Sequence, residues 1–156
     1  MSLKDILGVE KALIGMVHLL PLPGSPRWGG EMDRVVRRAV EDARALKAGG
    51  MDAIVVENYG DVPFTPGRVE AATVAAMTAV IIEVTKTISL PIGVNVLKND
   101  ARSGLAIAAA TGARFIRVNI HVGAVVADQG LIQSDAYSTL RDRRLLLAEE
   151  FDTLGV

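Results

Sequence analysis

Residues 51–64 read MDAIVVENYGDVPF, and this stretch decides the fold. Residues 53–56 form a short run of apolar, mostly β-branched side chains, and Glu57 and Asn58 follow immediately before a turn. A buried strand of a parallel sheet has this pattern, because helices cover both of its faces and polar groups come only at its carboxyl end. Parallel α/β folds place their chemistry at that end. The stretch therefore predicts a parallel α/β protein with functional groups after the strand.

The composition is that of a globular protein. Half of the 156 residues are hydrophobic, which is enough for one domain with one core over residues 1–156. Lys and Arg total 17 and Asp and Glu total 18, so the net charge argues against a nucleic-acid partner and favours small-molecule or protein partners. The chain has no cysteine, which excludes thiolate metal sites and a cysteine nucleophile. No motif in the sequence requires a cofactor, and the sequence does not identify one.

The N-terminal segment does not have the pattern of a secretion signal. Charged Lys4, Asp5, Glu10 and Lys11 stand where a secretion signal needs an apolar core. The uncharged run over residues 71–82 is too short to cross a bilayer. We therefore expect a cytoplasmic protein without a transmembrane segment.

Hydrophobic periodicity and turn residues predict four strand–helix units in succession. The expected strands cover residues 12–19, 53–56, 91–98 and 115–121, and the expected helices cover residues 31–48, 66–86, 101–111 and 135–153. Thr65 and Asp100 are the expected N-caps, and residues 122–134 are expected to form a long connection. The glycine-led pattern that precedes two of the strands recurs at Leu154, where a fifth strand would begin. Parallel strands with right-handed crossovers satisfy this order.

Four βα units make half of a (β/α)8 barrel of the TIM type. We therefore expect residues 1–156 to be the N-terminal half of such a barrel, with strands five to eight absent. Leaving the inner-face side chains of a half-barrel in water would cost roughly 10 to 18 kcal/mol. The structural alternative is a small open four-stranded sheet, which would need helices on both faces.

Polar side chains interrupt each expected strand near its carboxyl end. In chain order they are His18, Glu57, Asn95, Arg117, Asn119 and His121. Because side chains alternate between the two faces of a strand, Arg117, Asn119 and His121 share one side of the last strand. If these faces point to the barrel axis, His18, Glu57, Asn95 and Asn119 converge. The alternative is that these groups satisfy one another or loop backbone, as buried polar groups must.

Glu57 is the leading candidate for a general base or a metal ligand, because a carboxylate in an apolar surround suits both roles. His18 and His121 are the other candidates for acid–base catalysis, and His18 would join Glu57 if a metal is bound. The candidates for ligand binding are Asn58, Asp61, Asn95, Lys98, Asn99, Arg117, Asn119 and Asp128. Lys98 and Arg117 are the candidates for holding an anion. Alternatively, Asp61 and Asp128 only cap turns.

Several longer stretches resemble the BtpA/SgcQ family. They are MVHLLPLPGSPRW at residues 16–28, DAIVVENYGDVPF at 52–64, LPIGVNVLKNDA at 90–101, GARFIRVNIHVGAVVADQGLI at 112–132 and LRDRR at 140–144. The resemblance implies a (β/α)8 barrel grouped with the ribulose-phosphate-binding barrels. Members of the family are longer than this chain, so the region where related barrels bind phosphate, after strands seven and eight, would be missing.

The resemblance implies two classes of function. The family name comes from a role in photosystem I biogenesis at thylakoid membranes, which implies an assembly factor for a membrane complex, with peripheral membrane association. SgcQ-type members are suspected enzymes of sugar metabolism, which implies a small polar ligand, phosphosugar- or nucleoside-like, and a lyase, hydrolase or isomerase type of reaction. A pocket of converging polar groups would favour the enzyme, and an exposed apolar surface would favour the assembly role. A truncated product without activity is the third alternative.

We expect the half-barrel to require a partner, either a second copy in a homodimer or a separate C-terminal half. Its outer strands would be unpaired edges, which pair readily with another chain. For a homodimer, the midpoint of thermal unfolding should rise with protein concentration, because dimerisation is coupled to folding. Light scattering and unfolding at several concentrations measure this. A folded monomer whose midpoint is independent of concentration would contradict it.

Overall fold

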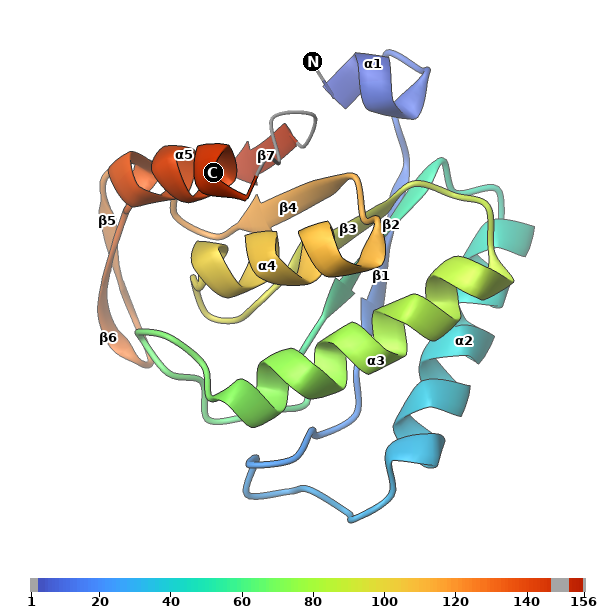
Figure 1. Cartoon of the computed structure of the whole chain (residues 1–156), viewed down its shortest axis with the longest axis horizontal. Coiled ribbons are helices and arrows are strands. Elements are labelled where there is room, and N and C mark those ends of the chain that lie inside the picture. Colours follow the sequence, from blue (N-terminus) through green and yellow to red (C-terminus); the bar gives the residue numbers. More distant parts are fainter. Residues whose placement is uncertain (1–2, 147–151, 156) are drawn as a thin grey trace.

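A five-stranded parallel sheet lies at the centre of the molecule (Figure 1). The structure is a computed structural model that describes residues 3–146 and 152–155. The strands are β1 (Ile14–His18), β2 (Ala53–Glu57), β3 (Ile92–Asn95), β4 (Phe115–Val118) and β7 (Asp152–Gly155), and the sheet order is β1-β2-β3-β4-β7. Neighbouring strands are parallel throughout this sheet. The parallel α/β architecture predicted from the sequence is therefore confirmed, in an open sheet.

Three helices cover one face of the sheet: α2 (Met32–Ala48), α3 (Ala71–Thr87) and α4 (Ala101–Thr111). A short helix, α1 (Leu3–Leu7), precedes β1. After β4 the chain forms a two-stranded antiparallel sheet of β5 (Ala124–Ala127) and β6 (Gly130–Gln133), and the helix α5 (Ala136–Leu145) follows it. No helix among residues 3–146 and 152–155 is long and apolar enough to cross a membrane.

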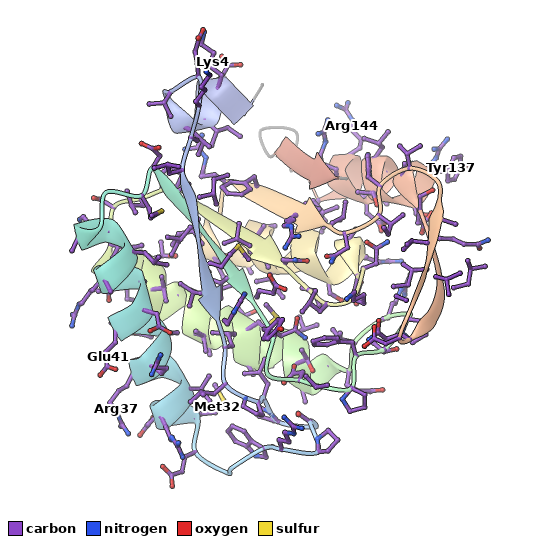
Figure 2. All side chains as sticks on the ribbon, turned by 180° about the vertical axis from the view of Figure 1, so that it is seen from behind. Lys4, Met32, Arg37, Glu41, Tyr137 and Arg144 are labelled. Carbon is purple, nitrogen blue, oxygen red and sulfur yellow. The ribbon has the colours of Figure 1, made fainter. Side chains whose placement is uncertain are left out.

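The two faces of the sheet carry different sets of buried side chains. Alternate strand residues, with Val17, Ile54 and Ile116 among them, pack beneath α2, α3 and α4 in the main core. The residues of opposite parity form a smaller cluster of Ala53, Val55 and Phe115, against which Ile6 and Leu7 of α1 and Ile14 and Met16 of β1 pack. Figure 2 views the molecule from this second side. Apolar residues thus occupy the amino-terminal part of both faces.

Two helices have the limits that the sequence predicts, apart from one residue at the start of α2. The carboxylate of Asp100 caps α4 by accepting a hydrogen bond from the Ser103 N–H at 3.0 Å. Gly112 ends the same helix at a φ of 75°, in the left-handed region that glycine tolerates best. Capping and glycine stops are local signals, which explains why they were readable from the sequence.

The helix α3 begins at Ala71, so the prediction of a start at Thr65 and Pro66 was wrong. The Thr65 hydroxyl caps only a turn, where it accepts a hydrogen bond from the Gly67 N–H at 3.2 Å. Two residues later the Val69 N–H donates to the Asp100 carboxylate at 2.9 Å, across the space between two loops. This tertiary contact holds the segment outside the helix.

Strands β3 and β4 are shorter than predicted, because side chains of the loops take the next backbone groups. β3 ends at Asn95 and not at Lys98, and the Leu97 N–H donates to the Asn58 side chain at 2.7 Å. β4 ends at Val118 and not at His121. Beyond it the Ile120 N–H donates to the Asn99 side chain at 2.8 Å. An asparagine side chain thus replaces the neighbouring strand as the acceptor.

The connection expected over residues 122–134 contains the antiparallel hairpin of β5 and β6, which the sequence analysis missed. The pairing of Ala127 with Gly130 leaves a two-residue turn, and Gly130 has a φ of 101°. Most of its apolar side chains are exposed, so the hairpin lacks the alternation of buried and exposed residues that predicts a strand.

The last helix ends at Leu145, and the prediction that it continues to Thr153 was wrong. Residues 152–155 form β7 and pair in parallel with β4, from Phe115 opposite Asp152 to Val118 opposite Gly155. The part of the expected helix over residues 147–151 lies outside the described residues. A fifth parallel strand thus occupies the edge of β4, which the sequence analysis expected to be unpaired. Pairing with the backbone of β4 outweighs the weak helical pattern.

The close packing of β3 against β4 at Gly93 leads to a prediction, for which Gly104 of α4 serves as the control. A Cβ at Gly93 would collide with the ring of Phe115, which is fully buried and cannot move aside. Gly93→Ala should therefore lower the free energy of unfolding by about 1–3 kcal/mol or more. Gly104 of α4 is the control, because a Cβ there would make an ordinary contact with Ile116 at 3.7 Å.

Gly104→Ala should leave the free energy of unfolding unchanged or raise it by up to about 1 kcal/mol, since alanine favours a helix interior. Urea unfolding of the two variants beside the unmodified chain measures both values. Equal effects of the two substitutions would mean that the Phe115 ring does not fill the space above Gly93.

Candidate functional site

Polar side chains from neighbouring strands lie in one row across the carboxyl end of the sheet. The strand register places His18 beside Glu57 and Glu57 beside Asn95. The pairing of Val94 with Ile116 places the next residue of β4, Arg117, beside Asn95. We call His18, Glu57, Asn95 and Arg117 the polar row. Neighbouring members are about 4.8 Å apart between strands, so the row spans roughly 14 Å.

The polar row faces away from α2, α3 and α4. Glu57 has the parity of Val55, and Arg117 that of Phe115, and both apolar residues belong to the smaller cluster beside α1. The face therefore changes from apolar at the amino ends of the strands to polar at their carboxyl ends. This is the arrangement in which parallel α/β proteins place functional groups.

A weak ion pair joins two members of the polar row. Nη1 of Arg117 lies 3.4 Å from Oε2 of Glu57, longer than the 2.7–2.9 Å that is typical of such bonds. The Glu57 side chain is only 6% exposed, whereas that of Arg117 is 36% exposed. Asn95 lies on the strand between them, buried, and neither atom of its amide has a hydrogen-bond partner within the described ranges.

Aromatic and cationic side chains from the loops after β2 and β3 gather beside His18. The exposed ring of His18 stacks on Tyr59, with the ring centroids 4.4 Å apart. Tyr59 in turn contacts Phe64 with a centroid distance of 6.4 Å, and Nζ of Lys98 lies 5.7 Å from the centroid of Phe64. The candidates His18 and Lys98 thus lie at the two ends of one aromatic cluster. Tyr59 was not among the predicted site residues, although its place directly after Glu57 and Asn58 was the available signal.

Two of the predicted ligand-binding residues, Asn58 and Asp61, hold loops together. The buried amide of Asn58 accepts a hydrogen bond from the Leu97 N–H at 2.7 Å and donates one to Asp61 at 3.1 Å. The other oxygen of Asp61 accepts a hydrogen bond from the Leu22 N–H at 2.7 Å. These bonds connect the loops that follow β1, β2 and β3. Both side chains are therefore occupied in the loops that surround the polar row.

Asn99 has the same kind of role. Its amide donates to the carbonyl of Ile120 at 3.0 Å and accepts from the N–H of the same residue at 2.8 Å, so it joins the loop after β3 to the end of β4. Asn119 lies just past β4, and its Oδ1 is buried without a partner in the described part of the chain. The structure connects neither residue to the Glu57–Arg117 pair.

The remaining candidates lie apart from the polar row. His121 is in the bend between β4 and β5, and Asp128 is in the exposed turn of the hairpin. Across residues 3–146 and 152–155, no hydrogen bond, ion pair or ring contact joins either residue to the row. Within those ranges, no three His, Cys, Asp or Glu side chains are grouped as metal ligands would be. His18 and Glu57, the two residues expected to join in a metal site, lie next to each other on neighbouring strands.

Two cavities lie beside the carboxyl ends of the strands and not over the polar row. The first has a volume of about 160 Å³ and is lined by residues that include Asn58, Asp61, Phe64, Arg68 and Leu97. The second, of about 400 Å³, lies between α4 and α5. A further cavity, of about 470 Å³, is lined by His18 and Met16 of β1 and by residues of α2. The members of the polar row, and not one enclosed volume, define the candidate site.

The comparisons with known proteins agree with one another. A model of the BtpA family matches residues 9–154. The photosystem I biogenesis protein BtpA of Synechocystis sp. is 48% identical over 149 residues, which cover 96% of this chain and 52% of that protein. An uncharacterized protein of Archaeoglobus fulgidus is 46% identical over 138 residues, 88% of this chain and 55% of that protein. The protein SgcQ of Escherichia coli is 38% identical over 154 residues, 97% of this chain and 56% of that protein. The chain spans about half the length of these curated relatives.

Asp61 makes stability depend on pH. Burial raises the pKa of its carboxyl group, and the hydrogen bonds from Leu22 and Asn58 only partly oppose this effect. The folded state then binds a proton more tightly than the unfolded state, so this contribution to stability is present at low pH and is lost as pH rises through the raised pKa. Relative to Asp61→Asn, which does not titrate, the free energy of unfolding should fall as pH rises from the ordinary aspartate range.

Urea unfolding of the unmodified chain and of Asp61→Asn at a series of pH values measures this difference. The loss of a hydrogen bond in the variant shifts all values equally, so only the slope with pH is diagnostic. If the free energy of unfolding of the unmodified chain instead rises with pH relative to that of Asp61→Asn, the hydrogen bonds of the Asp61 carboxylate outweigh its burial.

Proposed function

The chain belongs to the BtpA family, and from this membership and the polar row we propose that it binds a small polar ligand, phosphosugar- or nucleoside-like, at the carboxyl ends of its strands. The observation that carries the proposal is the buried Glu57 carboxylate, held in one row with His18, Asn95 and Arg117 on the side of the sheet opposite α2, α3 and α4. A buried carboxylate with a loose partner at 3.4 Å is able to exchange that partner for a ligand.

We also propose that the sheet is the first part of a (β/α)8 barrel. The strands lie side by side in sequence order, and α2, α3 and α4 cover their outer face. The inner face has an apolar layer that includes Val55 and Phe115, below the polar row. Layered side chains of this kind fill barrel interiors. In such a barrel the polar row would lie at the mouth, where barrel enzymes bind their substrates.

In this function Glu57 acts as the hydrogen-bond acceptor or general base. Its Oε2 would accept the proton of a ligand hydroxyl or of an acidic C–H group, as an isomerase, lyase or hydrolase requires. Arg117 would remain close enough to stabilise negative charge that develops on the ligand. His18 is exposed on the neighbouring strand and is placed to exchange protons with solvent.

Glu57→Gln tests the role of Glu57. The substitution keeps the size of the side chain and removes the charge, so we expect ligand binding to weaken by about tenfold or more while the midpoint of thermal unfolding changes by less than about 2 °C. Binding is measured as changes in the NMR signals of β2 and β3 during titration with a panel of sugar phosphates and nucleosides.

The control is Glu41→Gln, because Glu41 projects from the outer side of α2 (Figure 2). It should change neither binding nor unfolding. A large drop in the unfolding midpoint of Glu57→Gln, with binding intact, would assign Glu57 a structural role instead.

A second candidate function is that of an assembly factor, and the exposed apolar hairpin favours it. Val122, Val126 and Leu131 are 78%, 81% and 58% exposed. Exposed apolar side chains that lie together mark surfaces for partner proteins. The relative from Synechocystis is named for photosystem I biogenesis, which agrees with such a role. The titration separates the two functions, since an assembly factor would show no response of the polar row to small polar molecules.

A further inference from the structure

Asn95 is a buried amide that bonds to nothing in the described part of the chain. The residue is 1% exposed, and both its Oδ1 and its Nδ2 lack a hydrogen-bond partner. An unpaired buried amide is costly, and proteins keep one mainly where it binds a ligand, water or ion. Asn58 and Asn99 of the neighbouring loops each donate and accept a hydrogen bond that holds a loop, whereas Oδ1 of Asn119, just past β4, also lacks a partner in the described residues. Among these asparagines, Asn95 is the one in the polar row, and both atoms of its amide are available for a ligand.

The Glu57–Arg117 ion pair crosses the strand that carries Asn95. Glu57 and Arg117 are on β2 and β4, about 10 Å apart across β3, so the long arginine side chain must pass over β3 to bring Nη1 within 3.4 Å of the carboxylate. Arg117 is the partner that is able to leave, because its side chain is 36% exposed and that of Glu57 is 6% exposed. Release of Arg117 would open the space above Asn95.

The layer below closes the site from beneath. Gly93, two residues before Asn95, has no side chain, and the Phe115 ring occupies the space above it. Val55 and Phe115 belong to the same buried apolar cluster. A ligand above Asn95 would therefore rest on an apolar floor and make its polar contacts only with the members of the row. Such a site suits a polar molecule with hydroxyl groups.

We infer, on the basis of the proposed ligand-binding function, that Asn95 and Arg117 together select an anionic sugar, either a sugar acid or a sugar phosphate. Neighbouring hydroxyls supply both the donor that Oδ1 of Asn95 lacks and the acceptor that its Nδ2 lacks. The anionic group takes the guanidinium of Arg117, for which carboxylates and phosphates are the best partners. Glu57, freed from Arg117, accepts a hydrogen bond from a further hydroxyl.

Charge decides between this class and the neutral nucleosides. A neutral ligand offers Arg117 no ion in exchange for Glu57, so the pair would stay closed over Asn95. An anion compensates the guanidinium fully, and the hydroxyl that donates to Glu57 compensates the carboxylate. The ligand must therefore carry an anionic group and hydroxyl groups at the same time.

The test uses four probes: gluconate, glucose phosphate, sorbitol and inorganic phosphate. The readout is the pair of NMR signals from the Asn95 side-chain amide of the 156-residue chain, assigned by their loss in Asn95→Leu. Gluconate or glucose phosphate should shift these signals with a Kd at least about tenfold lower than that of sorbitol or inorganic phosphate, since each lost polar contact costs about a factor of ten. The two anionic sugars distinguish a carboxylate site from a phosphate site.

Two variants assign the contacts. Arg117→Met should remove the preference for the anionic sugars over sorbitol, whereas Arg114→Met, an exposed arginine at the other end of β4, should keep it. Asn95→Leu should weaken binding of the preferred sugar about tenfold. Because this variant lacks the Asn95 amide signals, its binding is measured from shifts of the β2 backbone signals. The substitution should also raise the midpoint of thermal unfolding by about 2–4 °C, because the buried amide has no bond to lose.

The outcomes separate this inference from the function on which it rests. Sorbitol or a neutral nucleoside that binds at the row as tightly as gluconate and glucose phosphate would overturn the inference and leave the ligand-binding function in place. A lower unfolding midpoint for Asn95→Leu with unchanged binding would also overturn it, since Asn95 would then be structural. If no small polar molecule shifts the signals of the row, both the inference and the proposed function fail.

Discussion

The parallel register of β2 with its two neighbours is the constraint on which the candidate site depends. Glu57 lies opposite His18 on one side and Asn95 on the other because the backbone hydrogen bonds fix which residues face each other. Side chains alternate between the faces, so a slip of one residue would turn Glu57 toward α2, α3 and α4 and bring Val56 to the opposite side. The apolar residues of β2 resist such a slip, because they are buried on both faces of the sheet.

The hydrogen bonds of the loops divide the polar residues at the strand ends into two groups. Asn58, Asp61 and Asn99 bond to backbone groups of neighbouring loops and fix the positions of those loops. Glu57, Asn95 and Arg117 keep unused or loosely used bonding capacity. Rigid loops around incompletely bonded side chains are what a binding site needs, because a ligand then meets groups that are already in place.

The sequence predicted the parts of the fold that local chemistry controls. The run before Glu57, the glycine stop of α4 and the Asp100 cap are local signals, and they were read correctly. The start of α3 and the ends of β3 and β4 depend on contacts between distant residues, such as Val69 with Asp100, and no local pattern encodes them. That polar residues stand at the carboxyl ends of the strands was also predictable. Which amide bonds to the backbone and which stays unpaired was not, because this depends on distances between loops.

The Phe115 ring above Gly93 means that one space is shared by two positions on neighbouring strands. A larger side chain at position 93 requires a smaller one at position 115, so the two positions are expected to change together as related sequences diverge. Because this pair forms the floor beneath Asn95, a coupled exchange would raise or lower the floor while the register of the sheet stays the same. The depth of the site is therefore open to evolutionary change at two positions that carry no polar groups themselves.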